Sequence, residues 1–471
     1  MKLKTNALEF YNEISESVRA FIEADKIELT ADEDADITVM RQIKENEVYA
    51  CAVYRGIRGE SREELVSADA VMRERISKRC VKLAVYFALK SYTGRQLPWG
   101  SLTGIRPTKL AREYADAGNV SHVLLEKYDL PTKKGELLEE ICANQEAFYT
   151  PQENEIDVYI GIPFCRTRCT YCSFSTTDST KGEKLMVPYV EALLKEMEQT
   201  KAMLEEQKRQ IRCLYIGGGT PTALTEALFE KMMRYAAKVF FPKKEFTVEA
   251  GRPDTVTETK LRIMKECGVS RISINPQSMN AQTLEKVGRH HSPADIVRCF
   301  ALAREIGFQT INADIIAGLP EETPKMFFST LSQVLALQAE NITVHTLALK
   351  RGSLMAEHGF CGSDESYVQQ MVEGALDILR PRGYKPYYLY RQKYMTGNFE
   401  NIGYALPEHI GIYNIDIMEE TTDIAAIGCG AVSKRILRRE GRIERAFNFK
   451  SIYEYIRRID EAQIRKNALF S

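Results

Sequence analysis

Between residues 156 and 349 the chain repeats one unit, a short apolar run rich in β-branched residues followed by a helical stretch. The runs that we expect to form strands are Val158–Pro163, Cys213–Ile216, Phe246–Glu249, Arg271–Ile274, Thr310–Ile316 and Ile342–Leu347. We expect helices between them, such as Glu183–Glu206 and Thr225–Phe240, and the second shows apolar residues at helical spacing. A repeat length of about thirty residues suits strand–helix crossovers of a parallel sheet. The sequence therefore predicts an α/β fold with a partial (β/α)6 barrel.

The repeat occupies only the middle of the 471-residue chain, which is long enough for two or three domains. Residues 1–150 contain an expected strand pair and an amphipathic helix over Arg75–Tyr92, so we predict an N-terminal α+β accessory domain. We assign the barrel to residues 151–355. The pattern changes again after it, and we predict a C-terminal α+β domain on the substrate side at residues 356–471.

The charges of the chain nearly balance, with 64 Lys and Arg against 65 Asp and Glu, which gives no support for nucleic-acid binding through bulk charge. No apolar stretch approaches the length of a membrane span, and the N-terminus lacks the apolar core of a signal peptide. The eleven cysteines are scattered singly apart from one triplet. We therefore expect a cytoplasmic protein with reduced thiols and no nucleic-acid partner.

The first expected strand leads directly into that triplet, Cys165-Arg-Thr-Arg-Cys169-Thr-Tyr-Cys172. Three thiolates within eight residues can bind three irons of a [4Fe–4S] cluster and leave the fourth iron open, whereas an electron-transfer cluster normally has four cysteines. A structural zinc site is the alternative, but it needs four ligands and the next cysteine is Cys213. The spacing therefore predicts an open cluster.

Special residues also follow the next four expected strands, at the rim where the chemistry of such barrels gathers. They are Gly217-Gly-Gly-Thr-Pro221, Glu249, Gln277 and Asp314. Glycines let a ligand approach the backbone closely. The alternative is a tight strand-to-helix turn with Thr220 or Thr222 as a helix cap.

An open iron can bind the amino and carboxylate groups of S-adenosylmethionine. An electron from the reduced cluster then splits the sulfonium into methionine and a 5′-deoxyadenosyl radical. For this cofactor, Glu249 can accept hydrogen bonds from the amino group or ribose, and Asp314 suits the ribose hydroxyls. Arg289 can bind a carboxylate because the guanidinium matches its geometry. An internal salt bridge in the barrel mouth is the alternative for Glu249 and Asp314.

These motifs together resemble the radical S-adenosylmethionine enzymes, within the oxygen-independent coproporphyrinogen III oxidase group, over residues 155–435. The segments that carry the resemblance are Tyr159–Cys165, Tyr215–Pro221, Phe246–Ala250, Ile272–Ser278, Val287–His290 and Asp314–Pro320. The resemblance implies that Cys165, Cys169 and Cys172 bind the cluster. It implies cofactor contacts at Tyr159, Tyr171, Gly218, Gly219, Thr220, Glu249, Gln277, Arg289, Asp314 and, more weakly, Ala348.

The resemblance also implies a reaction, in which two propionates of coproporphyrinogen III become vinyl groups and protoporphyrinogen IX forms. An electron donor such as flavodoxin or ferredoxin would act as partner. The chain departs from the well-studied members at three points: Phe174 replaces a further cysteine, Gly161 replaces a histidine, and the N-terminal region is additional. No catalytic side chain is assigned.

The replacement of the further cysteine by Phe174 makes the chain similar to the haem-chaperone relatives, which bind haem without decarboxylation. The N-terminal region and the segments 388–393 and 397–404 look instead like the HemZ-type coproporphyrinogen dehydrogenase branch. We therefore predict the decarboxylase, with a haem chaperone as the main alternative and radical modification of haem as a third. Candidates for binding the substrate's carboxylates are Arg391, Lys393, Lys434 and Arg435, with ordinary surface charge as the alternative.

Overall fold

The computed structural model describes residues 1–22, 24, 26–65, 69–104, 106–174, 176–180, 182–350, 352–360, 362–392 and 395–471. Lys393 lies outside them. The chain forms two compact units, Met1–Glu139 and Glu140–Ser471. Among the described residues, no helix combines the length and apolar character that crossing a membrane requires.

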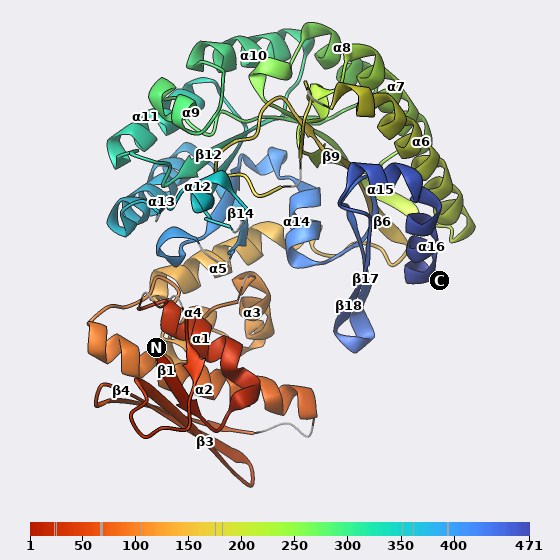
Figure 1. Cartoon of the computed structure of the whole chain (residues 1–471). Helices are drawn as coiled ribbons and strands as arrows, with labels where there is room; N and C mark the ends of the chain where they lie inside the picture. The colour runs from red at the N-terminus through yellow and green to blue at the C-terminus, as the bar shows by residue number, and fades with distance from the viewer. Residues whose placement is uncertain are drawn as a thin grey trace. The chain divides into compact units, whose positions relative to one another are not determined.

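The N-terminal unit combines one five-stranded sheet with helices (Figure 1). Its strands, in the spatial order β2-β1-β3-β4-β5, are β1 (Lys2–Thr5), β2 (Glu28–Leu29), β3 (Ile37–Lys44), β4 (Glu47–Tyr54) and β5 (Ile57–Glu64). Its helices are α1 (Tyr11–Arg19), α2 (Ala70–Thr93), α3 (Pro107–Glu113), α4 (Val120–Tyr128) and the start of α5 (Thr132–Gln145). The expected strand pair and amphipathic helix are confirmed as β3, β4 and α2.

Helix α2 shows how local sequence sets an element of this unit. Asp69 caps its first turn by accepting a hydrogen bond from the Val71 N–H, and Gly94 ends it in a left-handed conformation with φ 68°. Its buried face includes Val81, Ala84 and Val85, which belong to the hydrophobic core that it shares with the sheet. The N-terminal unit therefore has a core of its own.

Six parallel strands form the centre of the second unit. They are β6 (Glu155–Ile162), β9 (Gln210–Gly218), β10 (Glu245–Gly251), β11 (Arg271–Ile274), β12 (Ile311–Ala317) and β13 (Asn341–Thr346). All six predicted strands are thus confirmed. Two short strands, β7 (Phe164–Cys165) and β8 (Thr177–Asp178), pair beside the cysteine loop.

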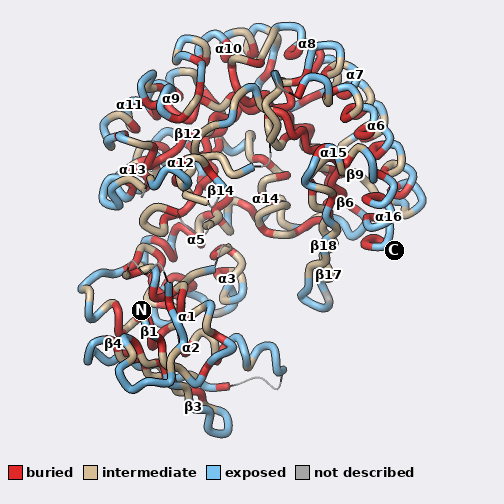
Figure 2. The backbone as a smooth tube through the Cα atoms, viewed as in Figure 1, coloured by how far each residue is buried: buried red, intermediate tan, exposed pale blue. Residues whose placement is uncertain are grey.

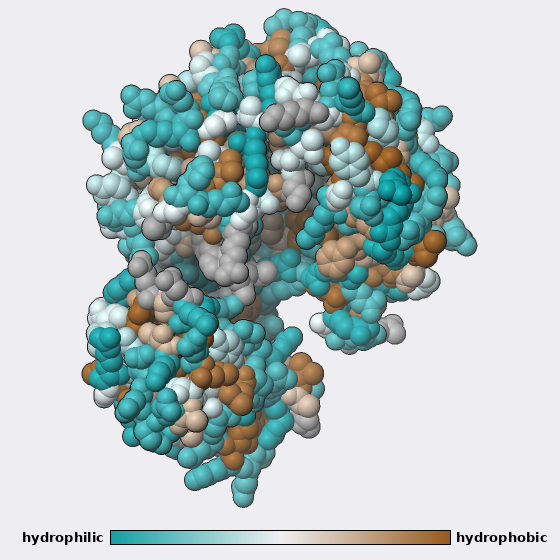
Figure 3. Space-filling model, in the orientation of Figure 1, coloured by the Kyte–Doolittle hydropathy of each residue, from teal (hydrophilic) through white to brown (hydrophobic). Residues whose placement is uncertain are grey.

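Helices cover the outside of these strands, as expected for crossovers in a parallel sheet (Figure 1). They are α6 (Glu183–Glu206), α7 (Glu226–Val239), α8 (Glu258–Glu266), α9 (Ala281–Lys286), α10 (Pro293–Ile306) and α11 (Pro324–Ala336). The strands are buried while the outer helix faces are exposed (Figure 2), and the surface over α9, α10 and α11 is mainly hydrophilic (Figure 3). The apolar stripe of each helix therefore faces the sheet.

Residues after 355 extend the same sheet at both of its edges. β15 (Asn401–Ala405) pairs antiparallel with β13, and β14 (Lys385–Tyr390) pairs with β15. At the other edge β16 (Asp423–Ile427) runs parallel to β6 and continues into the hairpin β17 (Val432–Leu437) and β18 (Arg442–Phe447). The remaining helices are α12 (Leu354–Glu357), α13 (Glu365–Leu379), α14 (Ile412–Glu419), α15 (Ile452–Arg457) and α16 (Ile459–Phe470). The division into three domains stays a prediction.

Candidate functional site

A cavity of about 470 Å³ opens at the carboxyl ends of the parallel strands. Every second residue of these strands contributes its side chain to the cavity lining, because successive side chains of a strand point to opposite faces. The alternating pairs are Thr247 and Glu249 on β10, Arg271 and Ser273 on β11, Asn312 and Asp314 on β12, and Thr343 and His345 on β13. The volume lies in the range of small-molecule sites.

The cavity brings together every residue that the sequence singled out for a cluster or a cofactor. Cys165, Cys169 and Cys172 line it, and so do all ten predicted cofactor contacts, from Tyr159 on β6 to Ala348 beyond β13. These residues come from all six parallel strands or the loops that follow them. Their convergence is a finding of the structure, whereas their roles toward a ligand are proposals.

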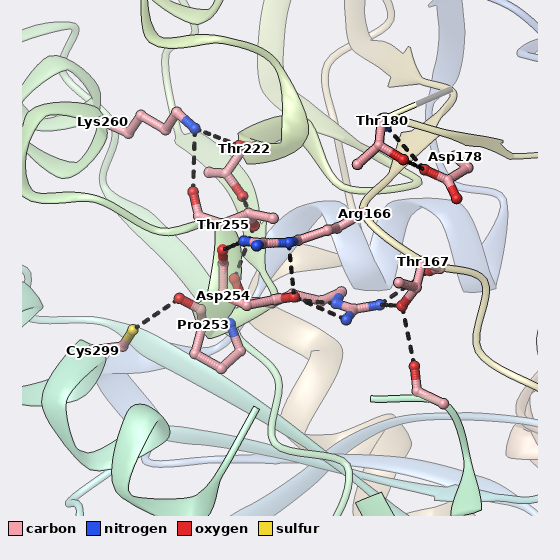
Figure 4. Close-up of polar contacts among 12 residues, drawn as sticks. Arg166, Thr167, Asp178, Thr180, Thr222, Pro253, Asp254, Thr255, Lys260 and Cys299 are labelled. Atoms are coloured by element: carbon pink, nitrogen blue, oxygen red, sulfur yellow. Dashed lines mark hydrogen bonds and ion pairs between the residues drawn. The ribbon is translucent and has the colours of Figure 1, made fainter. Parts of the chain in front are cut away.

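The cysteine loop is held in place by contacts to two other loops. Arg252 is buried and donates hydrogen bonds to the Thr167 carbonyl (3.0 Å) and hydroxyl (2.7 Å), while a bidentate ion pair fixes it to Asp254. Arg166 donates to the Asp254 carbonyl at 2.7 Å (Figure 4). The Thr167 hydroxyl donates in turn to the Gly288 carbonyl at 3.1 Å. The chain between the first two cysteines is therefore positioned before any ligand binds.

The three thiols of this loop are too far apart for one metal ion. Two thiolates bound to one zinc at about 2.3 Å would lie about 3.8 Å apart in tetrahedral geometry. In the described part of the chain, the sulfur atoms of these three cysteines do not all lie within 4.8 Å of one another. In a cluster each thiolate binds a different iron, so a wider separation is required. The geometry thus fits an iron–sulfur cluster better than zinc.

The glycines at the carboxyl end of β9 are explained by the close approach of two neighbours. A Cβ on Gly219 would lie 2.6 Å from the Phe164 carbonyl oxygen and 3.0 Å from the Cys165 sulfur, and a Cβ on Gly217 would lie 2.7 Å from the Glu249 carboxyl carbon. Gly218 has φ +108°, a conformation that side chains rarely adopt. The glycine segment therefore lets the cysteine loop and Glu249 lie against β9.

The amide groups of this segment already have protein partners. Gly219 N–H donates to the Ile162 carbonyl and Thr220 N–H to the Phe164 carbonyl, both at 2.7 Å. Gly218 N–H donates to Glu249 at 3.3 Å. A ligand would therefore meet carbonyl oxygens here rather than these N–H groups.

Neither threonine near this segment acts as a helix cap, which corrects the alternative weighed from the sequence. The Thr220 hydroxyl points at the Cys165 sulfur at 3.5 Å, and no side-chain cap bond starts the short helix after it. The Thr222 hydroxyl donates to the Ala250 carbonyl at 2.7 Å. Thr220 is thus part of the cysteine environment.

Glu249 is half-buried in the cavity wall and accepts a hydrogen bond from the Tyr215 hydroxyl at 2.6 Å. Burial raises the pKa of Glu249 to about 7, with the nearby Asp314 charge adding to the increase and the Tyr215 hydrogen bond opposing it. No ion pair of Glu249 occurs among the described residues, so the salt-bridge alternative fails for it. A carboxyl group with a pKa near 7 can ionise at neutral pH and attract a cationic ligand.

Asp314 differs, because it pairs with a histidine. His345 Nε2 lies 3.6 Å from Asp314 Oδ2, and Asn312 donates to Oδ1 at 2.8 Å. Burial opposes ionisation of Asp314, but the hydrogen bonds and charge of His345, with Asn312, outweigh it and hold the pKa of Asp314 below its usual value. Tyr390 contacts the other ring nitrogen of His345 at 3.4 Å. The salt-bridge alternative is therefore partly right for Asp314.

Arg289 and Gln277 also line the cavity. Arg289 donates to the Asn275 carbonyl at 2.7 Å, and its buried Nε has no hydrogen-bonding partner among the described residues. Burial disfavours the charge of Arg289, yet the neighbouring Tyr171 and Cys169 groups raise its pKa. Gln277 has φ +63°, which is strained for a residue with a side chain and typical of functional sites. The unpartnered donor of Arg289 fits an anionic group of a ligand.

Sequence reasoning missed several lining residues, including Tyr215, His345 and Lys350. The polar alternation Asn312/Asp314 and Thr343/His345 was a readable signal for two neighbouring inward faces. The cations expected from the C-terminal part lie elsewhere, since the cavity lining includes neither Arg391 nor Lys434 nor Arg435. Arg391 donates to the Asn398 carbonyl (3.1 Å), and Arg435 to the Leu469 carbonyl (2.9 Å).

Comparison with known proteins gives a consistent picture. Residues 159–334 match the Radical SAM superfamily. The chain is 39% identical over 420 residues to the oxygen-independent coproporphyrinogen-III oxidase-like protein HemZ of Bacillus subtilis (strain 168), with 85% of this chain and 83% of that protein covered. It is 38% identical over 197 residues to the heme chaperone HemW of the same organism, with 41% and 50% covered.

A solved structure supports the fold. The coproporphyrinogen III oxidase HemN of Escherichia coli, described as a radical SAM enzyme, superposes with a TM-score of 0.53 at 22% sequence identity. The superposition covers 68% of this chain and 72% of HemN. At this identity the likeness concerns the fold alone, and it agrees with the partial barrel predicted from the sequence.

Proposed function

The chain belongs to the radical SAM superfamily, in the family of oxygen-independent coproporphyrinogen-III oxidase-like proteins, and from this premise we propose that it decarboxylates coproporphyrinogen III oxidatively without oxygen, forming protoporphyrinogen IX. The observation that carries the proposal is the convergence of the cysteine triplet and all ten predicted cofactor contacts on one cavity. Similarity to HemZ along most of both chains supports this branch over others.

In this proposal Cys165, Cys169 and Cys172 hold a [4Fe–4S] cluster, with S-adenosylmethionine beside it. When bound, these groups would supply the radical chemistry that removes a hydrogen atom from a propionate side chain. Each propionate radical would then lose carbon dioxide and pass one electron to a one-electron acceptor, which leaves a vinyl group. A one-electron donor such as flavodoxin or ferredoxin is part of the proposal.

The protein's own residues would bind and orient the cofactor. Ionised Glu249 would attract its amino group, Asp314 would accept hydrogen bonds from hydroxyl groups, and Arg289 would donate to a carboxylate. The side chains of Glu249 and Asp314 are already held by Tyr215 and His345, so little ordering is needed when the ligand binds.

The test is anaerobic incubation of reconstituted protein with coproporphyrinogen III, a reductant and S-adenosylmethionine, followed by mass spectrometry of the tetrapyrrole. We expect loss of two carboxyl groups per tetrapyrrole, no product from Cys169→Ala, and full product from Cys51→Ala, which changes a cysteine of the N-terminal unit. If methionine and 5′-deoxyadenosine form while the tetrapyrrole is never consumed, the substrate assignment is wrong.

A haem chaperone is the second candidate, favoured by Phe174 in place of a further cysteine and by the similarity to HemW. The Phe174 ring is 65% exposed at the rim of the cavity, where it can contact a large planar ligand. This candidate predicts stoichiometric haem binding and transfer of haem to an apo-protein, with no change in the mass of the tetrapyrrole. The same mass spectra therefore separate the two functions.

A further inference from the structure

Among the described residues, five cationic side chains line the cavity, and four of them contact protein groups. Arg252 is paired with Asp254, and Arg289 donates to the Asn275 carbonyl while its Nε stays available to a ligand. Arg271 lies 3.8 Å from Glu245 and donates to the His409 carbonyl. Arg168 donates to the carbonyl oxygens of Cys172 and Gly352. These contacts hold Arg168, Arg252 and Arg271 in the walls, and Arg289 already has a role toward the cofactor in the proposed function.

Lys350 is the exception. It follows β13 by four residues, is half-buried, and lines the cavity near Cys172. Within the described part of the chain, its ammonium has neither a carboxylate partner nor a hydrogen bond to a protein acceptor. The two acidic residues of the cavity, Glu249 and Asp314, are held by other groups. A half-buried ammonium without a partner loses hydration that an incoming anion can replace.

The surroundings of Lys350 indicate what kind of anion fits. The same cavity is lined by Phe174, Leu347, Ile316 and Tyr390, which offer apolar and aromatic surface. Phe174, two residues after Cys172, is largely exposed. A ligand with a broad apolar body and a carboxylate on a short arm would satisfy both the rings and the ammonium.

We propose that Lys350 is a specificity-determining residue, which binds a propionate carboxylate of a tetrapyrrole while the macrocycle contacts Phe174. This inference rests on the proposed function and names the contact by which the cavity selects a substrate with peripheral carboxylates. A carboxylate could also come from the methionine part of S-adenosylmethionine, so the experiment must separate the two sources.

The experiment measures equilibrium binding of coproporphyrin III, the stable oxidised tetracarboxylate, to the full-length reconstituted protein under anaerobic conditions. Its tetra-amide, in which each carboxylate is replaced by an uncharged amide, serves as the second ligand. Lys350→Gln should weaken coproporphyrin III binding about tenfold and leave tetra-amide binding unchanged, because only the charged contact is lost. Lys350→Arg should retain most of the affinity, since the positive charge persists.

The matched control is Lys231→Gln, which removes an exposed lysine of α7 outside the cavity lining and should leave both affinities as in the unchanged protein. Iron and sulfide content and S-adenosylmethionine affinity should not change in Lys350→Gln. Equal binding by Lys350→Gln and the unchanged protein, or equal weakening of acid and amide, would overturn the inference. A selective loss of S-adenosylmethionine binding would assign Lys350 to the cofactor instead.

Failure of the proposed function has a different signature. If coproporphyrin III binds with the expected dependence on Lys350 but no decarboxylated product appears, the decarboxylase proposal fails and the carboxylate contact stands. If product forms at the unchanged rate and affinity in Lys350→Gln, the inference fails and the proposed function stands.

Discussion

The two ends of the barrel both bury charged side chains, but they treat them differently. At the carboxyl end, Glu249, Asp314 and Arg289 face a cavity. At the amino end, Arg212 donates to Asp416 at 2.8 Å and to Glu155 at 3.0 Å, and all three side chains are at most 6% exposed. Buried charge that is paired within the protein serves the fold, whereas buried charge facing a cavity is available to a ligand.

A cysteine and two acidic residues also come together at the amino end of the barrel, which we call the closed end. One oxygen or sulfur atom from each of Asp157, Cys213 and Asp416 lies within 4.8 Å of the others, all buried. Burial and the charge of Asp416 raise the pKa of Asp157 well above its usual value, which favours the neutral form of this carboxyl group. Arg212 pairs with Asp416 in the same group, so the fold accounts for it without a ligand, in contrast to the thiols of the cavity.

The largest expected effect contrasts a cysteine of each end. In the proposed function Cys169→Ala removes one iron ligand, so we expect loss of the brown colour, of stoichiometric iron and sulfide, and of S-adenosylmethionine cleavage by at least about a hundredfold. Cys213→Ala should keep the cluster and cleavage, with reduced stability because the side chain is fully buried. Loss of the cluster in Cys213→Ala, with the cluster retained in Cys169→Ala, would contradict this prediction.

The second test breaks the closed end. Arg212→Met leaves Asp416 and Glu155 buried without their cation, which should destabilise the barrel by about 3–5 kcal/mol. Arg234→Met, which removes one exposed ion pair within α7 and one to Glu266 of α8, should destabilise the barrel much less. Urea unfolding followed by circular dichroism measures both. The only Trp, Trp99, reports separately on the N-terminal unit by its fluorescence. Similar losses in the two variants would show that the closed end adds little stability.

The third test concerns how ligand affinity at the carboxyl end of the barrel depends on pH. Because the pKa of Glu249 is about 7, its carboxyl group becomes ionised as the pH rises from 6 to 8. The affinity for the cationic S-adenosylmethionine should therefore rise by up to about tenfold over this interval, since one proton is lost. Glu249→Gln should bind weakly with a flat pH profile, measured by equilibrium dialysis. A profile that stays steep in Glu249→Gln would point to another titrating group.

The smallest expected effect is a pH-dependent change at the closed end. A raised pKa means that Asp157 contributes stability fully at pH below its unfolded value, about 4, and loses it as the pH rises through its folded value. Asp157→Asn should therefore gain stability relative to the unchanged protein as the pH increases from 5 to 9. Thermal unfolding across this range measures the difference in stability between Asp157→Asn and the unchanged protein. A difference that stays constant with pH would contradict the prediction.

Local sequence was sufficient for the strands and for much of the open site. Strand β11 and helix α6 have the predicted bounds, because each apolar pattern is short-range and ends at turn residues. Glu249 and Asp314 were found because the carboxyl ends of parallel strands meet at one rim. His345 was missed since a single histidine in a strand carries little signal alone.

Long-range pairing could not be predicted in the same way. Arg212 meets Asp416 across 204 positions of sequence, and no local pattern marks the two as partners. Arg391 and Arg435 were candidates because a substrate with several carboxylates needs basic partners, with ordinary surface charge as the alternative, yet both donate to backbone carbonyls outside the cavity lining. Composition indicates that a charge exists but not which surface it faces.

By itself the sequence determined the six strand–helix units, the cysteine triplet and the glycine segment, because each depends on neighbouring residues and on a fixed period. Only the tertiary structure decided which buried charges face a cavity and which are paired within the fold. Closing the sheet into a partial barrel brings side chains more than a hundred residues apart within hydrogen-bonding distance, and these distances decide whether a charge is left for a ligand.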